Sequence, residues 1–113
     1  MATPGSWVAA HHADERIVTE FEVDDSGTAR FTLRGELDLA TIGPVRDEVN
    51  EALEGGAKQV VFDLSNVAFL DSSALALFSQ TALYVGVTIE QPSDLVRTTI
   101  DITGLASLLT VMP

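Results

Sequence analysis

The pattern of hydrophobic and polar positions divides the chain into alternating strands and helices. Residues 16–23 and 28–35 alternate apolar and polar side chains, which is typical of strands with one buried face. Between them, residues 24–27 read Asp-Asp-Ser-Gly, a turn sequence whose glycine accepts a positive φ. The two runs therefore predict a β-hairpin.

Helical spacing follows the hairpin. Apolar residues recur at intervals of three and four through residues 42–53, and the opposite face is mostly acidic. Thr41 is the expected N-cap, and Pro44 is acceptable because it falls in the first turn. Gly55-Gly56 ends the predicted helix, since glycine adopts the left-handed C-cap conformation without steric cost.

A short apolar run, residues 60–64, predicts a central strand that is buried on both faces and ends before Ser65-Asn66. A second helix is expected from residues 71–73 (Asp-Ser-Ser) to Leu83 or Tyr84, followed by a glycine turn and a strand over 87–89. The alternative starts that strand near Leu83 and leaves barely two turns of helix.

A third helix is predicted to open at Pro92-Ser93 and to run through Ile102, with residues 95, 96, 99 and 100 on its inner side. Gly104 stops it, and a last short strand is expected within residues 108–112. The order ββαβαβαβ predicts an α/β domain in which helices pack on a mixed sheet. The side chains expected between sheet and helices are Phe31, Leu33, Val49, Leu53, Val61, Leu75, Phe78 and Ile100.

Residues 1–14 show no periodicity and are expected to form a flexible N-terminal tail, which leaves residues 15–113 as one domain. The first residues lack the positive region of a signal peptide, and no apolar run approaches the roughly 18 residues of a membrane span. A cytoplasmic protein is therefore expected.

Composition narrows the function. The chain has no cysteine, which excludes disulfides, a thiolate nucleophile and cysteine-ligated zinc. Six basic against seventeen acidic residues give a net charge of −11. That charge argues against nucleic acid or an anionic membrane as a partner, and it is consistent either with solubility alone or with a basic partner.

The candidate chemistry lies in residues 71–73 (Asp-Ser-Ser), at the mouth of the central strand and the start of the second helix. Aspartate and serine are preferred N-caps there, and function is common at this edge of an open α/β sheet. The only histidines, His11-His12, fall in the expected tail, so no base is placed near Ser72. Asp38, Asp63 and Asp71 could hold a divalent cation, although capping accounts for them more simply, and we expect neither metal nor cofactor.

Three segments resemble the STAS domain of bacterial anti-sigma factor antagonists. They are Asp63-Leu64-Ser65-Asn66-Val67 continuing through residues 69–75 (FLDSSAL), the ending at residues 100–105 (IDITGL), and residues 35–38 (GELD) before the first helix. They follow the family's order and spacing over residues 16–112. The resemblance implies a STAS domain over residues 15–113.

The resemblance also implies a partner-switching protein that is not an enzyme. In that family the domain binds an anti-sigma factor, often a serine kinase, and thereby frees the sigma factor. The kinase phosphorylates the serine directly after the aspartate, here Ser72, and a separate phosphatase restores the protein. Carried over by position, the expected partner-binding residues are Asp38, Asp71, Ser73 and Ala74.

The chain departs from the family pattern in three places. Ala74 stands where the family usually has glycine. The segment from Asp71 to Pro92 is shorter than usual by about one helical turn, which predicts a shortened second helix, and no extra C-terminal helix is expected. Two alternative functions are a STAS scaffold module that is not phosphorylated and a small hydrolase that uses Ser72.

Overall fold

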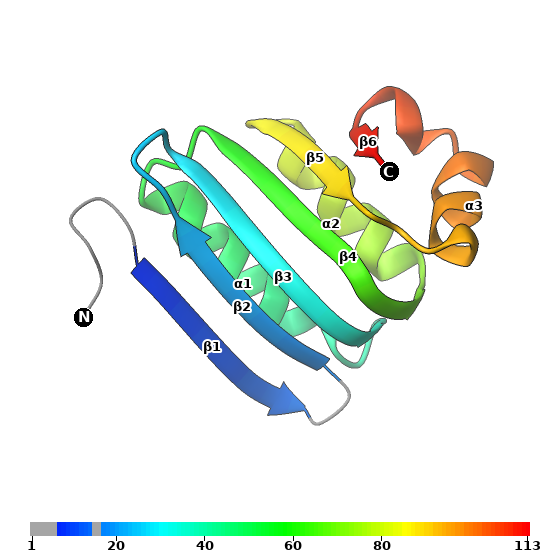
Figure 1. Cartoon of the computed structure of the whole chain (residues 1–113), viewed down its shortest axis with the longest axis horizontal. Coiled ribbons are helices and arrows are strands. Elements are labelled where there is room, and N and C mark those ends of the chain that lie inside the picture. The colour runs from blue at the N-terminus through cyan, green and yellow to red at the C-terminus, as the bar shows by residue number, and fades with distance from the viewer. Residues whose placement is uncertain (1–6, 15–16) are drawn as a thin grey trace.

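In the computed structural model, which describes residues 7–14 and 17–113, a mixed sheet carries its strands in the order β1-β2-β3-β4-β5-β6 (Figure 1). The elements are β1 (Trp7–Asp14), β2 (Ile17–Val23), β3 (Thr28–Leu37), α1 (Ile42–Glu54), β4 (Gln59–Leu70), α2 (Ser72–Ala82), β5 (Gly86–Glu90), α3 (Asp94–Ile102), the short 3₁₀ helix η1 (Leu105–Ser107) and β6 (Thr110–Met112).

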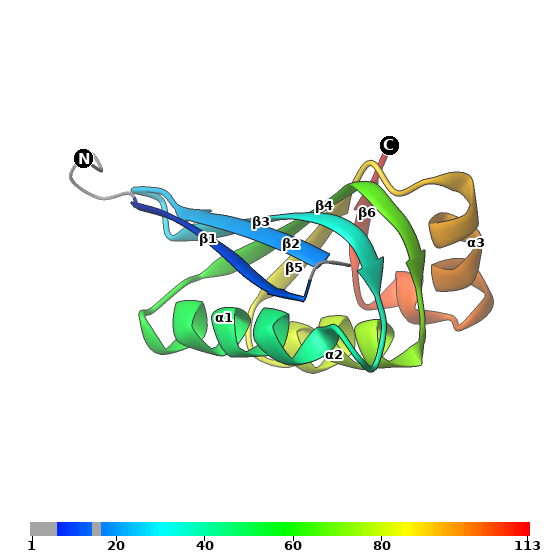
Figure 2. The same cartoon turned by 90° about the horizontal axis from the view of Figure 1, so that it is seen from below.

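The sheet changes from antiparallel to parallel at β3. Strands β1, β2 and β3 pair antiparallel, whereas β3 with β4, β4 with β5 and β5 with β6 pair parallel. Each parallel pair is joined through a helix, as parallel connections require. Figure 2 shows α1 and α2 side by side along one face of the sheet, whereas α3 lies at one end of it. The predicted α/β architecture is confirmed.

The second helix follows the longer of the two predicted courses. It runs from Ser72 to Ala82 with Leu83 as its C-cap, and β5 begins at Gly86. The third helix also begins where expected, because the Ser93 hydroxyl accepts a hydrogen bond from the Val96 N–H at 3.2 Å. Its predicted inner residue Leu95 is instead 60% exposed.

The prediction of a flexible tail over residues 1–14 is wrong for Trp7–Asp14, which form β1. This strand pairs antiparallel with β2, with Trp7 opposite Val23. The pairing supplies hydrogen-bond partners along an edge of β2 that would otherwise be open, a gain that the strand's own sequence pattern does not reveal. Residues 1–6 lie outside the described part of the chain.

The central strand is longer than predicted, because β4 continues through Ser65 and Asn66 to Leu70. Pairing with β3 persists to the end of both strands, with register shifts after Thr32 and after Gly35. Such irregularities bend a strand without ending it. The Asp63 carboxylate accepts a hydrogen bond from the Ser65 N–H at 3.0 Å within the bend.

Of the predicted core residues, only Leu53 is half-buried rather than buried. Val61 is buried but lies outside the cluster under the helices, because neighbouring residues of β4 face opposite sides of the sheet. It pairs with Arg30 and Thr88, and the ion pair from Arg30 to Glu90 spans β4 close by. The prediction that Val61 packs between sheet and helices is therefore wrong.

Four phenylalanines connect the sheet to the helix layer. Their ring centroids follow one another at 5.0 Å from Phe21 to Phe31, 5.5 Å from Phe31 to Phe62, and 4.7 Å from Phe62 to Phe78. The rings come from β2, β3, β4 and α2, and all four are fully buried. Aromatic pairs at such spacings add stability beyond their buried area.

Because Phe62 lies inside this row, Phe62→Ala should lower the free energy of unfolding by about 3–5 kcal/mol, as measured by urea denaturation followed by circular dichroism. Phe69→Ala is the matched control, since Phe69 belongs to the same strand but is 46% exposed. The control should cost less than half as much. Equal losses would show that the row of rings does not anchor the sheet.

Asp24 organises the β2–β3 turn and makes stability depend on pH. Its Oδ1 accepts hydrogen bonds from the Ser26 hydroxyl at 2.6 Å, the Ser26 N–H at 2.9 Å and the Thr28 N–H at 3.1 Å. The Ser26 hydroxyl, followed by the Thr28 N–H, lowers the pKa of Asp24 below its usual value of 3.8. A lowered pKa contributes stability above pH 3.8 that is lost as the pH falls through the folded-state value.

We therefore expect Asp24→Asn to lower the melting temperature at neutral pH, with the difference from wild type narrowing below pH 3.8. Asp25→Asn changes the same charge in the same turn without removing any of these hydrogen bonds. A pH series of thermal melts for both variants measures the effect. A difference for Asp24→Asn that stays constant as the pH falls would contradict the assignment.

Candidate functional site

Strands β3 and β4 end side by side, which brings the loops before α1 and α2 together. Leu37 and Leu70, the last residues of the two strands, are paired, and the Asp71 N–H donates to the Leu37 carbonyl at 3.2 Å. Both loops therefore lie at the carboxyl edge of the sheet, where open α/β sheets commonly place their functional residues.

The Asp71 carboxylate holds both loops at once. Asp71 has the extended conformation of an N-cap, and its Oδ1 accepts from the Ser73 N–H at 2.8 Å. Its Oδ2 accepts from the Leu39 N–H in the loop before α1, at 3.1 Å. Hydrogen bonds to an ionised carboxylate are stronger than those between neutral groups. The start of α2 and the neighbouring loop are thus tied to one side chain.

Asp38 shapes the loop before α1 in a similar way. Its Oδ1 accepts from the N–H groups of Ala40 at 3.0 Å and Thr41 at 3.1 Å. The buried Thr41 hydroxyl donates to the Glu36 carbonyl at 2.8 Å and accepts from the Asp38 N–H at 3.0 Å. Thr41 occupies the N-cap position of α1, as predicted, but its side chain closes the loop instead of capping the helix.

Ser72 is the first residue of α2 and is exposed. Its hydroxyl makes no hydrogen bond with any residue in the described part of the chain. Ser73 is half-buried, with its N–H engaged by Asp71, and Ala74 is fully buried in the core. The predicted partner-binding residues therefore differ in access, and the Ala74 side chain is withdrawn from the surface.

Two exposed apolar side chains at this edge of the sheet did not emerge from the sequence pattern. Leu39 is 76% exposed in the loop that Asp71 holds, and Phe69 is 46% exposed two residues before Asp71. Phe69 pairs with Glu36 at the end of β3, so both apolar side chains belong to the same edge of the sheet. The sequence signal that could have identified Leu39 is an apolar residue in a loop whose neighbouring residues, Asp38 and Thr41, are suited to helix capping.

The structure does not assemble the acidic cluster considered from the sequence. Asp38 and Asp71 each accept backbone hydrogen bonds from their own loops, and Asp63 accepts from Ser65. Across residues 7–14 and 17–113, no three side chains of the metal-ligating types lie close enough to hold an ion. Capping is thus the role that the geometry supports for these aspartates.

The two histidines lie on β1, which β2 and β3 separate from β4. Three strand spacings place their backbone roughly 14 Å across the sheet from that strand. Within the described ranges, therefore, no histidine is positioned as a base for Ser72.

Comparison with known proteins identifies this fold. A family model described as the STAS domain matches residues 21–113. The chain belongs to the STAS domain family. Among the described helices of this STAS domain, none has the length and apolar character needed to cross a membrane.

Two curated relatives of this chain carry the name anti-sigma-F factor antagonist. The anti-sigma-F factor antagonist RsfB of Mycobacterium tuberculosis strain H37Rv is 29% identical over 73 residues, which is 65% of this chain and 60% of that protein. The matched part thus spans about 60% of the curated relative.

Solved structures show the same fold. An anti-sigma factor antagonist from Mycobacterium paratuberculosis is 20% identical, covers 100% of this chain and 91% of its own, and superposes with a TM-score of 0.72. The Bacillus cell fate determinant SpoIIAA in its phosphorylated form is 19% identical, with 93% and 90% covered and a TM-score of 0.58.

If Asp71 ties the two loops together, Asp71→Ala should lower the free energy of unfolding by about 1–2 kcal/mol through loss of the cap. It should also speed amide hydrogen exchange at Leu39, although Leu39 is distant in sequence. Asp47→Ala, at an exposed position of α1, is the control and should change neither quantity. Unchanged exchange at Leu39 in Asp71→Ala would refute the tie between the loops.

Proposed function

We propose that this STAS domain is an anti-sigma factor antagonist, which binds an anti-sigma factor of the serine-kinase type and is released when Ser72 is phosphorylated. The observation that carries the proposal is the free, exposed Ser72 hydroxyl directly after the Asp71 cap. The name of RsfB and the phosphorylated form of SpoIIAA support it. A separate phosphatase would return the protein to its binding form.

The surface around Ser72 has the character of a protein interface. Leu39 and Phe69 present exposed apolar side chains at the edge of the sheet where Asp38 and Asp71 hold the loops before α1 and α2. Interfaces commonly place apolar anchors at the centre and polar groups at the rim. Because both aspartates accept backbone hydrogen bonds, we assign them a positioning role: they hold the loop that carries Leu39 and the helix start that follows β4, the strand of Phe69.

The net charge of −11 adds a long-range contribution. An acidic protein attracts a partner with a basic contact surface and speeds their encounter, and added salt weakens this attraction. A doubly negative phosphoryl group on Ser72 changes this net charge only slightly. Its effect on binding is therefore local, at the contact surface.

Phosphorylation can switch binding without altering the fold. The reaction moves the terminal phosphoryl group of ATP to the Ser72 Oγ, leaves ADP, and passes the hydroxyl proton to the kinase. The product carries about −1.5 to −2 charges beside the N-terminus of α2, where the helix dipole favours it. Asp71 repels it by a comparable amount and already occupies the Ser73 N–H. These opposing contributions leave the cap in place.

Across an interface the balance is different. A doubly charged group must be desolvated against a surface that fits a neutral hydroxyl, and desolvation of an unpaired charge is costly. A loss of about 3 kcal/mol weakens binding roughly a hundredfold. We assign Ser72 the role of phosphate acceptor, not of the catalytic nucleophile of a hydrolase, because no histidine is placed beside it within the described residues.

Ser72→Asp should therefore keep the circular dichroism spectrum and nearly the melting temperature of wild type, yet bind the cognate anti-sigma factor roughly a hundredfold more weakly in calorimetry. Ser72→Ala should bind normally but take no label from radioactive ATP. Ser73→Ala is the matched hydroxyl control and should still be labelled. Label that persists in Ser72→Ala and disappears in Ser73→Ala would assign the switch to the wrong serine.

A further inference from the structure

A groove lies between α1 and α2. It consists of two adjoining hollows of about 400 and 580 Å³ that share Asn50, Leu53 and Tyr84 as lining residues. Arg46 lines only the first hollow, and Glu54 lines only the second. The groove therefore has a basic group toward one end, an acidic group toward the other, and apolar side chains between them.

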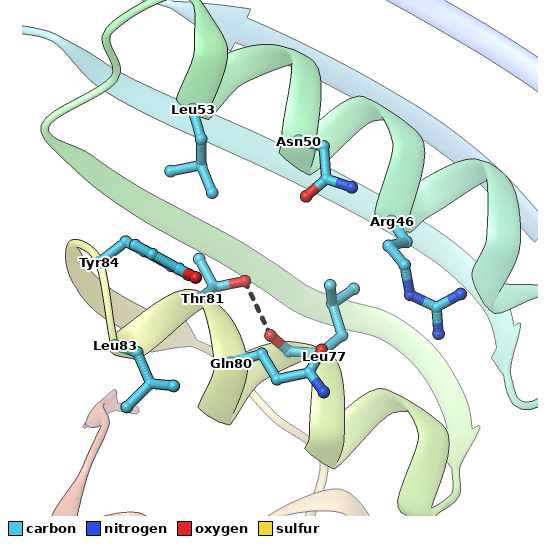
Figure 3. A pocket seen from close by; sticks show the side chains of 8 residues that line it. All are labelled: Arg46, Asn50, Leu53, Leu77, Gln80, Thr81, Leu83 and Tyr84. Atoms are coloured by element: carbon cyan, nitrogen blue, oxygen red, sulfur yellow. Dashed lines mark hydrogen bonds between the residues drawn. The ribbon is translucent and has the colours of Figure 1, made fainter.

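The side chains of the groove do not close it. Figure 3 shows Arg46, Asn50 and Leu53 projecting from α1 toward α2, and the Tyr84 ring lying beside Thr81 at the end of α2. Within the described part of the chain, Arg46 has no ion pair and the Asn50 amide has no hydrogen bond. The Thr81 hydroxyl donates back to the carbonyl of its own helix at 2.7 Å (Figure 3). Polar groups thus line the groove without partners across it.

Charge is distributed unequally between the two helices. The exposed charged positions of α1 are Arg46, Asp47, Glu51 and Glu54, of which Arg46 and Glu54 line the groove, whereas no charged residue occurs from Ser72 to Gly86. A solvent-facing helix without charge is unusual in a chain of net charge −11. Surfaces that become covered by another protein are depleted in charge and enriched in aromatic residues, and Tyr84 is 78% exposed here.

We propose that this groove binds an amphipathic helix of a partner protein whose flanking residues are basic. Helices bind such grooves with apolar side chains at positions i, i+3 or i+4, and i+7. From Arg46 to Leu53 the groove extends about 10 Å along α1, the same length that i to i+7 spans on a bound helix. Lysine or arginine beside the apolar face would pair with Glu54, which lines the second hollow, and with Glu51, which is exposed on the same helix outside the hollows.

This binding surface goes beyond the Ser72 switch and is independent of it. Ser72 begins α2, whereas Tyr84 follows its end, roughly 18 Å away along the helix axis. A helix in the groove therefore leaves the phosphate acceptor accessible. Experiments can therefore confirm or refute the groove proposal and the Ser72 proposal separately.

The test uses the full chain and a synthetic leucine–lysine peptide with apolar residues at helical three–four spacing. A peptide of identical composition but scrambled order serves as the control. In a nuclear magnetic resonance titration at physiological salt, the ordered peptide should shift amides of residues 46–57 and 80–85. Tyr84→Ala should weaken binding at least tenfold, whereas Leu95→Ala, at an exposed apolar position of α3, should leave it unchanged.

A charge swap tests the contribution of the two acidic residues of α1, Glu51 and Glu54. Glu51→Lys with Glu54→Lys should weaken binding of the leucine–lysine peptide at least tenfold and create binding of a leucine–glutamate peptide. Glu20→Lys with Glu22→Lys makes the same change in net charge at exposed positions of β2 and should retain the original preference. Ser72→Asp should have no effect on either peptide.

Three outcomes would overturn the proposal. The scrambled peptide could bind as well as the ordered one, which would show that binding depends on the charge of the peptide and not on the spacing of its apolar residues. The shifts could fall outside the groove. The same groove amides could shift with protein concentration alone, which would make the groove a contact between copies of this chain.

Discussion

The row of phenylalanines from Phe21 to Phe78 is the contact on which the other features depend. It joins β2, β3 and β4 to α2 through fully buried rings with centroids 4.7–5.5 Å apart. Because β4 carries one of the middle rings and α2 carries the last, this packing holds α2 against the central strand. Ser72 is the first residue of the helix that is held in this way.

At the carboxyl edge, the residue that maintains the structure is separate from the residue of the proposed switch. Asp71 satisfies N–H groups of two loops, so its carboxylate is fully used in holding the surface together. Ser72, the next residue, takes no part in that network. A charge added to Ser72 therefore changes what the surface can bind without removing a hydrogen bond that maintains it. This division is what a reversible switch requires, since the unmodified and modified forms must both stay folded.

The helix α2 carries two kinds of surface along its length. Its start presents Ser72, the proposed phosphate acceptor, and the chain at its end presents the exposed Tyr84, which lines the groove shared with α1. The absence of charge along the whole helix is consistent with protein contacts at both ends. The opposite face of the sheet is different in character, with the ion pair between Arg30 and Glu90 crossing β4.

The sequence alone determined the features that arise within a few residues of one another: the hairpin with its turn, the starts of the helices, and the capping role of Asp71. Only the tertiary structure decided the pairing of β1, the extension of β4 through Ser65, the side of the sheet that Val61 faces, and the exposure of Leu39. The hydrogen bond from the Leu39 N–H to Asp71 joins residues 32 positions apart. Caps, turns and periodicity depend on neighbouring residues, whereas strand pairing and contacts between loops depend on partners that the local pattern does not specify.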